Sequence, residues 1–469
     1  MNERYVLAID NGSQSTKVHV VDATGKVVAS AQRPLRPYVY PAPGQVVHPD
    51  DDVWDSIISA CRDAMRAFTG DPKDIVGVGL CTIRFCRALL DSRGELVEPV
   101  LSWMDERVSR PHVTDERVAY VTTSSGYITH RLTGNFKDTA ANYAGMWPLD
   151  PQTMRFSTNP HAFVAAGMPR ELLFDLVDPG DLLGNITPAA AAATGIPVGL
   201  PVFATANDKA VESLGAGVDE QTVLLSLGTY IAAMTMGSIW REEPSVWVNY
   251  ASMPQCYLYE SMGIRRGMWT VSWVRDLLFP DGFEAPHGRA LEDQFNVEAA
   301  AAPIGSGGVL TLLDWLAPTD APFRRGAFLG FDGTQGRGHL FRSVLEGIAI
   351  TMADNIEAME TALGASYETV IVTGGGAKSD LMMQIVADVL GRPTRRAAVD
   401  DAAGLGAAIC AAVGAGLHPT WDRAIEAMVR RGVQFDPSAD RTEAYAPVRA
   451  RYRAMRQASD VLFRAIDEA

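Results

Sequence analysis

The strongest constraint on the fold is a β-hairpin pattern that occurs twice, far apart in this 469-residue chain. The first copy is an apolar run at residues 5–10, a short turn of small polar residues, and a second apolar run at 17–21. In the second copy, residues 223–234, Gly228 and Thr229 separate two apolar runs. Two strands joined by a tight turn is the simplest interpretation of both copies. The recurrence predicts two domains built on one plan, and a chain of this length is too long for one compact core.

Strand and helix patterns alternate around the hairpins, which predicts an α/β fold with mixed sheets flanked by helices. Further strands are expected at residues 77–80, 88–91, 200–205 and 369–373. Apolar residues at helical spacing predict helices at 53–68, 207–214, 340–363 and 381–390. Gly215 and Gly217 end the helix that starts at residue 207. We therefore expect an N-terminal domain at residues 1–217 and a C-terminal domain at 218–469.

Composition narrows the function classes. The formal net charge of −15 argues against nucleic acid and against an anionic membrane as partners, because a polyanion would be repelled over most of the surface. No apolar run approaches the roughly 18 residues of a membrane span, and the N-terminus lacks a signal-peptide core. The five cysteines show no CxxC spacing, so they are expected to be free thiols in a reducing compartment. We expect a cytoplasmic protein.

The turn of the first hairpin is a candidate phosphate and metal site. Its glycine and hydroxyl residues can point backbone N–H groups at phosphate oxygens, and Asp10 at the strand end can hold Mg²⁺ directly or through water. The turn residues are Gly12, Ser13, Gln14 and Ser15. Lys17 can meet a phosphate, although an isolated strand lysine is more often only solvated. The alternative is a plain hairpin turn capped by Asp10.

Two further glycine segments have the chemistry of a nucleotide site. Gly228 and Thr229 occupy the equivalent turn of the second hairpin, so two sets of donors can converge on one phosphate tail between the domains. A strand ending at Thr373 leads into a glycine loop and then a helix, which is an anion site in physical terms. The loop residues are Gly374, Gly375, Gly376, Ala377 and Ser379. It is neither a Walker A loop nor a Rossmann fingerprint, and the alternative is glycines that only pack a helix on a sheet.

Asp208 lies between a predicted strand and a predicted helix. The free N–H groups at a helix start stabilise a carboxylate as the anion, which can then accept a proton. On position alone, the commoner role of such an aspartate is a helix cap. Phosphoryl transfer to an alcohol needs one carboxylate that orients the hydroxyl group and takes its proton.

These four segments, in this order and spacing, resemble the FGGY family of carbohydrate kinases. The resemblance extends from Tyr5 to about Gly416, and it includes short matching stretches at 43–49, 102–107, 131–134, 342–347 and 404–408. It implies the two-domain actin-like ATPase fold, which is ribonuclease H-like, with the active site in the cleft between the domains.

The resemblance also implies an activity and a set of site residues. The activity is ATP-dependent phosphorylation of a hydroxyl on a small sugar or polyol, such as a pentulose or an alditol. Asp208 matches the catalytic base, Asp10 the Mg²⁺ ligand, and the two turns and the glycine loop the ATP site. Arg84, Trp103 and Asp105, together with Asp208, fall where the family contacts its polyol. Partners are then the sugar, ATP and, as a candidate, a second copy of the chain in a homodimer.

Two departures leave the substrate open. The segment from Arg107 to Leu132 is shorter than its counterpart in most members, and that region helps to wall the sugar pocket. Phe85 and Cys86 stand where many members carry polar or small groups. The alternatives are therefore a kinase for a non-standard polyol, such as a quorum-signal molecule, or an actin-like ATPase switch without a sugar substrate.

Overall fold

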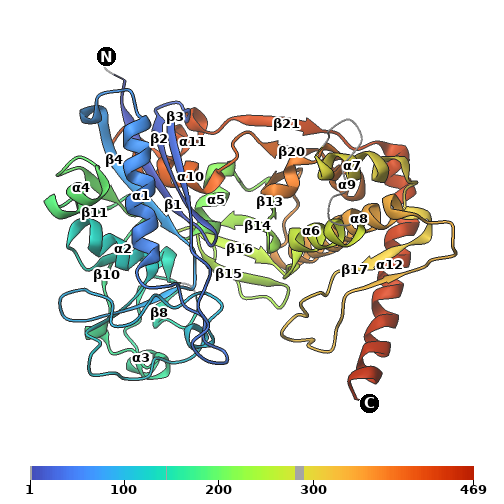
Figure 1. The fold of residues 1–469 in the computed structure, drawn as a ribbon, viewed down its shortest axis with the longest axis horizontal. Coiled ribbons are helices and arrows are strands. Elements are labelled where there is room, and N and C mark those ends of the chain that lie inside the picture. Colours follow the sequence, from blue (N-terminus) through green and yellow to red (C-terminus); the bar gives the residue numbers. More distant parts are fainter. Residues whose placement is uncertain (1–2, 144, 280–289, 469) are drawn as a thin grey trace.

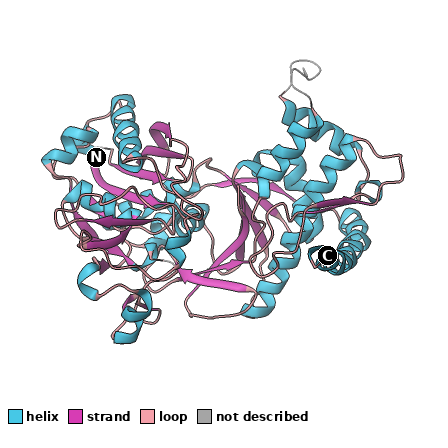
Figure 2. Ribbon diagram, turned by 60° about the horizontal axis from the view of Figure 1, so that its bottom comes forward, coloured by secondary structure: helices cyan, strands magenta, loops and turns pink. Residues whose placement is uncertain are grey.

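The structure is a computed structural model, and it describes residues 3–143, 145–279 and 290–468. It has two halves, each built around a mixed β-sheet with helices packed against it (Figure 1). Figure 2 shows the strands as two separate groups flanked by helices. The first sheet consists of β1 (Tyr5–Asn11), β2 (Ser15–Asp22), β3 (Val27–Pro34), β4 (Ile75–Thr82), β11 (Leu182–Asn185) and β12 (Pro201–Phe203). The second consists of β13 (Thr222–Leu227), β14 (Ile231–Gly237), β15 (Val246–Tyr250), β16 (Tyr257–Ser261), β19 (Thr369–Thr373), β20 (Thr394–Ala397) and β21 (Arg431–Phe435).

The two sheets share one topology. In the first, β1, β2 and β3 form an antiparallel meander, β4 and β12 run parallel to β1, and β11 closes the edge antiparallel to β12. In the second, β13, β14 and β16 take the places of β1, β2 and β3, while β19, β20 and β21 take those of β4, β12 and β11. Strand β15 is an addition at the edge next to β16. The predicted α/β fold with mixed sheets is confirmed.

Helices cover the sheets, and their local sequence explains where they form. Helix α1 (Asp52–Ala67) has acidic residues in its first turn and Arg66 in its last, which suits the helix dipole. Its buried side chains recur at helical spacing and pack against β2 and β3. The other helices are α2 (Ser124–Thr133), α3 (Pro160–Ala166), α4 (Pro188–Thr194), α5 (Asp208–Ala216), α6 (Gly267–Leu278), α7 (Leu291–Ala301), α8 (Arg337–Leu363), α9 (Asp380–Leu390), α10 (Ala402–Gly414), α11 (Trp421–Met428) and α12 (Ala439–Asp467).

Shorter strands lie outside the two sheets and pair two by two. The strand predicted at 88–91 is β5 (Arg87–Leu90), and it pairs with β6 (Tyr120–Thr123) rather than joining the first sheet. The other pairs are β7 (Lys137–Thr139) with β10 (Asp175–Val177), β8 (Leu149–Asp150) with β9 (Arg155–Phe156), and β17 (Leu310–Leu312) with β18 (Ala327–Leu329). Within the described residues, no helix is both long and apolar enough to cross a membrane.

The alternation of side chains along β1 decides where Asp10 points. Leu7 and Ile9 are buried in the core that contains α1 and α2. Val6 and Ala8 are buried in a second core, which includes α5, α10 and the second sheet. Because successive side chains of a strand point to opposite faces, Asp10 shares the face of Val6 and Ala8. The strand period therefore directs Asp10 toward α10 and the second half.

Helices α5 and α10 cross in close contact between the sheets. A Cβ atom added to Gly406 of α10 would lie 1.9 Å from the carbonyl oxygen of Val211 in α5. One added to Gly79 of β4 would lie 2.1 Å from the carbonyl oxygen of Ala407. Helix α10, which comes late in the chain, thus packs on the sheet of the first half, beside β1 and β4 (Figure 1). The halves are joined by this packing as well as by the chain itself.

Candidate active site

Asp10 lies in a buried cluster of charged groups at the end of β1. Its Oδ2 atom is 3.2 Å from Lys17 Nζ, which is also 3.2 Å from Asp401 Oδ1. Asp401 Oδ2 is 2.7 Å from His19 Nε2. Burial and the charge of Asp401 raise the pKa of Asp10 to about 7, with Lys17 acting in the opposite direction. Because two carboxylates hold the Lys17 ammonium group, the geometry does not support the prediction that Lys17 meets a phosphate.

The turn after β1 is a tight hairpin turn between β1 and β2. A hydrogen bond from Gly12 N to Ser15 O, 3.1 Å long, closes it. Ser15 Oγ accepts a hydrogen bond from Gln32 Nε2. In the described part of the chain, the side chains of Ser13 and Gln14 make no hydrogen bond. The turn therefore keeps polar groups available.

The second turn and the glycine loop meet at the start of α6. Gly228 O accepts a hydrogen bond from Met268 N at 3.0 Å, and Thr229 O accepts one from Gly267 N at 2.8 Å. A Cβ atom on Gly376 would lie 2.8 Å from Leu227 Cβ, so the glycine loop packs directly on β13. The first residues of α6 belong to this arrangement, although the sequence patterns did not single them out.

The glycines of these turns fall into two groups. Gly374 has a φ of 83°, and a Cβ atom there would lie 2.5 Å from Leu227 O, so the chain itself requires glycine. Gly12, Gly228 and Gly375 do not have positive φ, and an added Cβ atom would meet no atom closer than 3.5 Å in the chain. What glycine leaves open at these three positions is room for the close approach of a ligand.

Ser379 is a helix cap in this structure. Its Oγ atom accepts a hydrogen bond from Met382 N at 3.1 Å and donates one to Asn296 Oδ1 at 2.9 Å. These bonds hold the start of α9 against α7. The hydroxyl group of Ser379 is thus engaged within the chain, whereas Gly375 beside it is open.

Asp208 is the first residue of α5, and its neighbour Asn207 is the cap. Asn207 Oδ1 accepts hydrogen bonds from Lys209 N and Ala210 N, both 3.1 Å long. Asp208 Oδ1 is 3.0 Å from Lys209 N and 3.4 Å from Arg84 N, and Oδ2 accepts no hydrogen bond from any described residue. Burial raises the pKa of Asp208, and the charges of Arg84 and Lys209 limit the rise. The interpretation of Asp208 as the helix cap is wrong, because Asn207 fills that role.

A polar network ties the start of α5 to the second sheet. Lys209 Nζ lies 2.8 Å from Glu212 Oε2 and 2.9 Å from Ser226 Oγ. Glu212 Oε1 accepts hydrogen bonds from Ser226 Oγ at 2.9 Å and Thr373 Oγ1 at 2.6 Å. Asp208 is therefore held at a fixed position beside the ends of β13 and β19, from which the second turn and the glycine loop begin.

The proposed polyol contacts differ in how accessible they are. Arg84 reaches across to Glu260 of β16, with Nη1 2.7 Å from Oε2 and Nη2 2.9 Å from Oε1. Trp103 is 43% exposed. It lies beside Cys86, whose pKa is raised to about 12 by burial and by the charge of Asp208. Arg84, Trp103 and Asp208 thus lie around the same turn.

Asp105 does not fit the predicted role. Its side chain is fully buried, and its carboxylate accepts hydrogen bonds from Val46 N and from the backbone and guanidinium groups of Arg107, at 2.8–2.9 Å. Both oxygens are engaged in fixing the segment that follows Trp103. The prediction that Asp105 contacts the polyol is therefore not supported, because the carboxylate presents no surface to a ligand.

The thiol of Cys81 lies among the carboxylates of Asp10, Asp208 and Asp401. Cys81 Sγ donates a hydrogen bond to Asp10 Oδ1 at 3.4 Å. Burial and the negative charges of Asp10, Asp401 and Asp208 raise the pKa of Cys81 well above its ordinary value. Carboxylates from the first hairpin, from α5 and from the start of α10 thus surround one buried residue.

Comparison with known proteins agrees with this arrangement. Residues 5–114 and 109–215 match the N-terminal domain, and residues 223–415 the C-terminal domain, of the FGGY family of carbohydrate kinases. The chain belongs to the FGGY family of carbohydrate kinases. This assignment makes it a carbohydrate kinase, and its fold is the two-domain actin-like fold of that family.

Individual relatives of this FGGY kinase cover nearly the whole chain. The uncharacterized sugar kinase YgcE of Escherichia coli (strain K12) is 46% identical over 450 residues, 95% of this chain and 92% of its own length. L-fuculokinase of the same organism is 26% identical, over 86% of this chain and 90% of its own. The crystal structure of xylulose kinase from Rhodospirillum rubrum superimposes with a TM-score of 0.85 at 25% identity, covering 98% of this chain and 100% of that one.

Several residues around the candidate site had no distinct sequence signal. Glu260 sits in an ordinary strand. His48 lies in a stretch that matches the family, and the structure buries it 3.9 Å from Cys86 Sγ. Asp401 could have been found from the internal repeat, because it is the residue before α10 as Asn207 is the residue before α5. The described residues contain no cluster of three or more His, Cys, Asp or Glu that could hold a metal ion.

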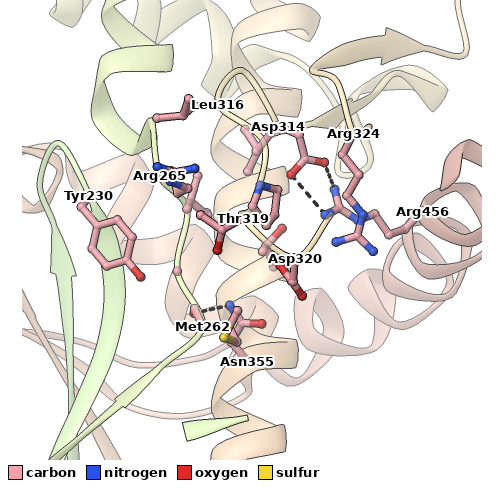
Figure 3. A pocket seen from close by; sticks show the side chains of 15 residues that line it. Tyr230, Met262, Arg265, Asp314, Leu316, Thr319, Asp320, Arg324, Asn355 and Arg456 are labelled. Carbon is pink, nitrogen blue, oxygen red and sulfur yellow. Dashed lines mark hydrogen bonds and ion pairs between the residues drawn. The ribbon is translucent and has the colours of Figure 1, made fainter. Parts of the chain in front are cut away.

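A cavity of about 450 Å³ lies in the second half of the FGGY kinase (Figure 3). Tyr230, next to the second turn, is on its wall, and Arg324 and Arg456 line another part. Both arginines form ion pairs with aspartates, Arg324 with Asp460 and Arg456 with Asp314. The charges of these two arginines are therefore already neutralised within the chain.

Proposed function

We propose that this kinase transfers the γ-phosphoryl group of ATP to a hydroxyl group of a small sugar or polyol, with Asp208 as the base. The observation that carries the proposal is the position of Asp208, whose Oδ2 atom accepts no hydrogen bond from any described residue, while Asn207 caps α5 and Lys209 anchors its first turn to Ser226. A carboxylate in this place can orient the attacking hydroxyl group and accept its proton. The raised pKa makes Asp208 a stronger proton acceptor than an exposed aspartate.

The residues present fit an ATP phosphate chain. Gly12, Gly228 and Gly375 leave open space where a side chain would otherwise stand, so phosphate oxygens can come close to backbone N–H groups of the two turns and the glycine loop. These groups would bind the phosphate oxygens from both halves of the protein. The first N–H groups of α6 are already used within the chain, because Gly267 N donates to Thr229 O and Met268 N donates to Gly228 O.

Asp10 is the residue that would hold Mg²⁺. A single protein carboxylate is enough, because Mg²⁺ in kinases is bound by one or two carboxylates together with substrate phosphates and water. The ion would neutralise charge on the phosphate oxygens. The chain itself keeps Asp10 in place through Lys17 and Cys81.

The acceptor would lie against Arg84 and Trp103 beside Asp208. Similarity to L-fuculokinase and xylulose kinase favours a ketose as acceptor. Phe85 next to Arg84 is an additional bulky wall, which favours a small acceptor. The domain boundary after Gly217 and the homodimer stay predictions.

The test is ADP release by the purified protein with Mg-ATP and a panel of ketoses, aldoses, alditols and the quorum-signal class of polyols. Strong stimulation by one small acceptor is expected. A steady ATPase activity that no acceptor stimulates would instead favour an actin-like ATPase switch.

A further inference from the structure

The turn that carries Arg84 is joined to the second half by a cluster of four side chains. Arg84 and Phe85 follow β4 of the first sheet, while Trp247 and Glu260 come from β15 and β16 of the second. We call these four residues the clasp. The Arg84–Glu260 pair is bidentate, with distances of 2.7 and 2.9 Å. The side chains of Arg84 and Glu260 are only 11% and 4% exposed.

The aromatic members hold the guanidinium group from the sides. Its central carbon lies 5.3 Å from the Phe85 ring centroid and 5.0 Å from that of Trp247, distances at which a cation is attracted to a ring face. The two rings are 5.5 Å apart. Ion pair and rings together leave the Arg84 side chain little freedom.

The backbone of the same turn is strained. Phe85 has a φ of 67°, in the left-handed region that a bulky aromatic residue rarely adopts. Such strain persists only where surrounding contacts hold it, and it gathers at functional sites. Here the contacts that hold it are Phe85 with Trp247 and Arg84 with Glu260. The same turn places Arg84 N 3.4 Å from Asp208 Oδ1.

We infer that Glu260 is a positioning residue for the phosphoryl acceptor, acting through Arg84. This inference rests on the proposed function. Glu260 takes one N–H of each Nη group of Arg84, so that the Nε–H group, which has no partner among the described residues, and the second N–H of each Nη group are left as donors for an acceptor hydroxyl group. Glu260 also ties the second half to the turn beside Asp208, so the ion pair links the acceptor side of the site to the second half of the protein.

The kinetic test compares Glu260→Gln with the wild type. The amide keeps the size of the side chain but not its charge, so the Arg84 side chain loses its fixed orientation. We expect the KM for the acceptor to rise about tenfold or more, while the KM for ATP changes by less than about twofold. Glu360→Gln is the matched control, because Glu360 forms a bidentate pair with Arg392, at 2.7 and 3.0 Å, within the second half. An unchanged acceptor KM, or equal changes for both substrates, would overturn the inference.

Epistasis separates positioning from a general structural effect. If Glu260 acts only through Arg84, Glu260→Gln has no further effect on kcat/KM for the acceptor in an Arg84→Ala background. The same fold-loss in both backgrounds would show that Glu260 acts independently and would contradict the inference. Glu260→Asp, which keeps the charge but shortens the side chain, is expected to lie between the wild type and Glu260→Gln.

A readout without turnover separates this inference from the proposed function. Amide hydrogen exchange of the full chain is expected to be about tenfold or more faster at residues 83–86 and 257–261 in Glu260→Gln, and unchanged at distant helices such as α12. The Glu360→Gln control should leave both segments protected. If no acceptor stimulates ADP release by the wild type, the proposed function fails. Amide hydrogen exchange then tests by itself whether Glu260 holds the turn that carries Arg84. Unchanged protection at both segments would then refute the inference.

Discussion

Asp208 owes its free carboxylate to the residue before it. Asn207 satisfies the first N–H groups of α5, so the Asp208 side chain is released from the capping role that its position suggested. A second anchor is the Lys209–Ser226 hydrogen bond of 2.9 Å, which fixes the start of the helix against β13. One carboxylate thus becomes available because its two neighbours carry the structural bonds.

Replacement of Asp208 by asparagine tests its role as base. Because the amide cannot accept the hydroxyl proton, Asp208→Asn is expected to reduce acceptor-dependent ADP release about 10³-fold. ATP affinity by calorimetry and the melting temperature should stay close to those of the wild type. Asp422→Asn, in the first turn of α11, is the control that should retain activity. Near-normal turnover by Asp208→Asn would rule out the assignment.

The titration of Asp138 is expected to make the stability of the protein depend on pH. It is fully buried, and burial raises its pKa to about 6, although hydrogen bonds from Asn142, Thr123, Thr139 and Ser125 act in the opposite direction. The folded state therefore binds this proton more tightly than the unfolded chain, whose carboxyl group has a pKa near 3.8. The stabilisation is fully present below about pH 4 and is lost as the pH rises through 6, on the order of 3 kcal/mol in total.

The variant Asp138→Asn cannot titrate at this position. Between pH 4 and pH 7, its free energy of unfolding relative to the wild type is expected to improve by about that amount. Urea unfolding of both proteins across this pH range measures the difference. A difference that does not change with pH would show that Asp138 does not titrate in this range.

At the crossing of α5 and α10, the two helix backbones are too close together for any residue larger than glycine to fit between them. Gly215 and Gly406 lie at the crossing, and a Cβ atom on either would be 1.9 Å from a backbone carbonyl oxygen of the other helix. Both helices also start beside the charged groups of the site, with Asp208 on α5 and Asp401 before α10. Their spacing therefore sets the distance between these carboxylates.

Gly406→Ala is expected to force the helices apart and to lower the free energy of unfolding by roughly 3 kcal/mol. Gly375→Ala is the matched substitution, because an added Cβ atom there meets nothing within 4 Å. It should leave stability within about 0.5 kcal/mol of the wild type while weakening ATP binding, which calorimetry can measure. Equal stability of the two variants would contradict the close crossing.

The molecule as a whole is two copies of one sheet topology that share a core. Val6 and Ala8 of β1 are buried in the same apolar cluster as β13, α8 and α10. The two-domain division predicted from the hairpins describes the sheets well, yet α10 lies on the sheet of the other half. The site residues occupy this shared region, at the ends of β1, β13 and β19.

A fragment of residues 1–217 is therefore expected not to fold alone. Without α10, the face of β1 and β4 that carries Val6 and Ala8 would be exposed to water. Circular dichroism should show no cooperative thermal transition for the fragment, and mixing with residues 218–469 should restore one. A cooperative transition of the isolated fragment would contradict this view of the shared core.

Much of the fold and part of the site follow from local patterns in the chain. The apolar run at residues 5–10 marks a strand, and because successive side chains of any strand point to opposite faces, it already determines that Asp10 shares a face with Val6 and Ala8. The repeated hairpin predicts two related sheets, and glycine with hydroxyl residues marks the turns. These features could be predicted because each depends on neighbours in sequence, whose side-chain directions the backbone geometry sets.

The remaining features depend on how the two halves pack. The local sequence around Asp105 and Glu260 does not predict the partner of either carboxylate. In the structure, Asp105 is buried in an ion pair with Arg107, whereas Glu260 pairs with Arg84 from the other half. Arg84 and Glu260 are 176 positions apart, and no local periodicity records such a pairing. Hydrogen bonds and ion pairs act over a few ångströms, so their partners are defined only once the chain has folded.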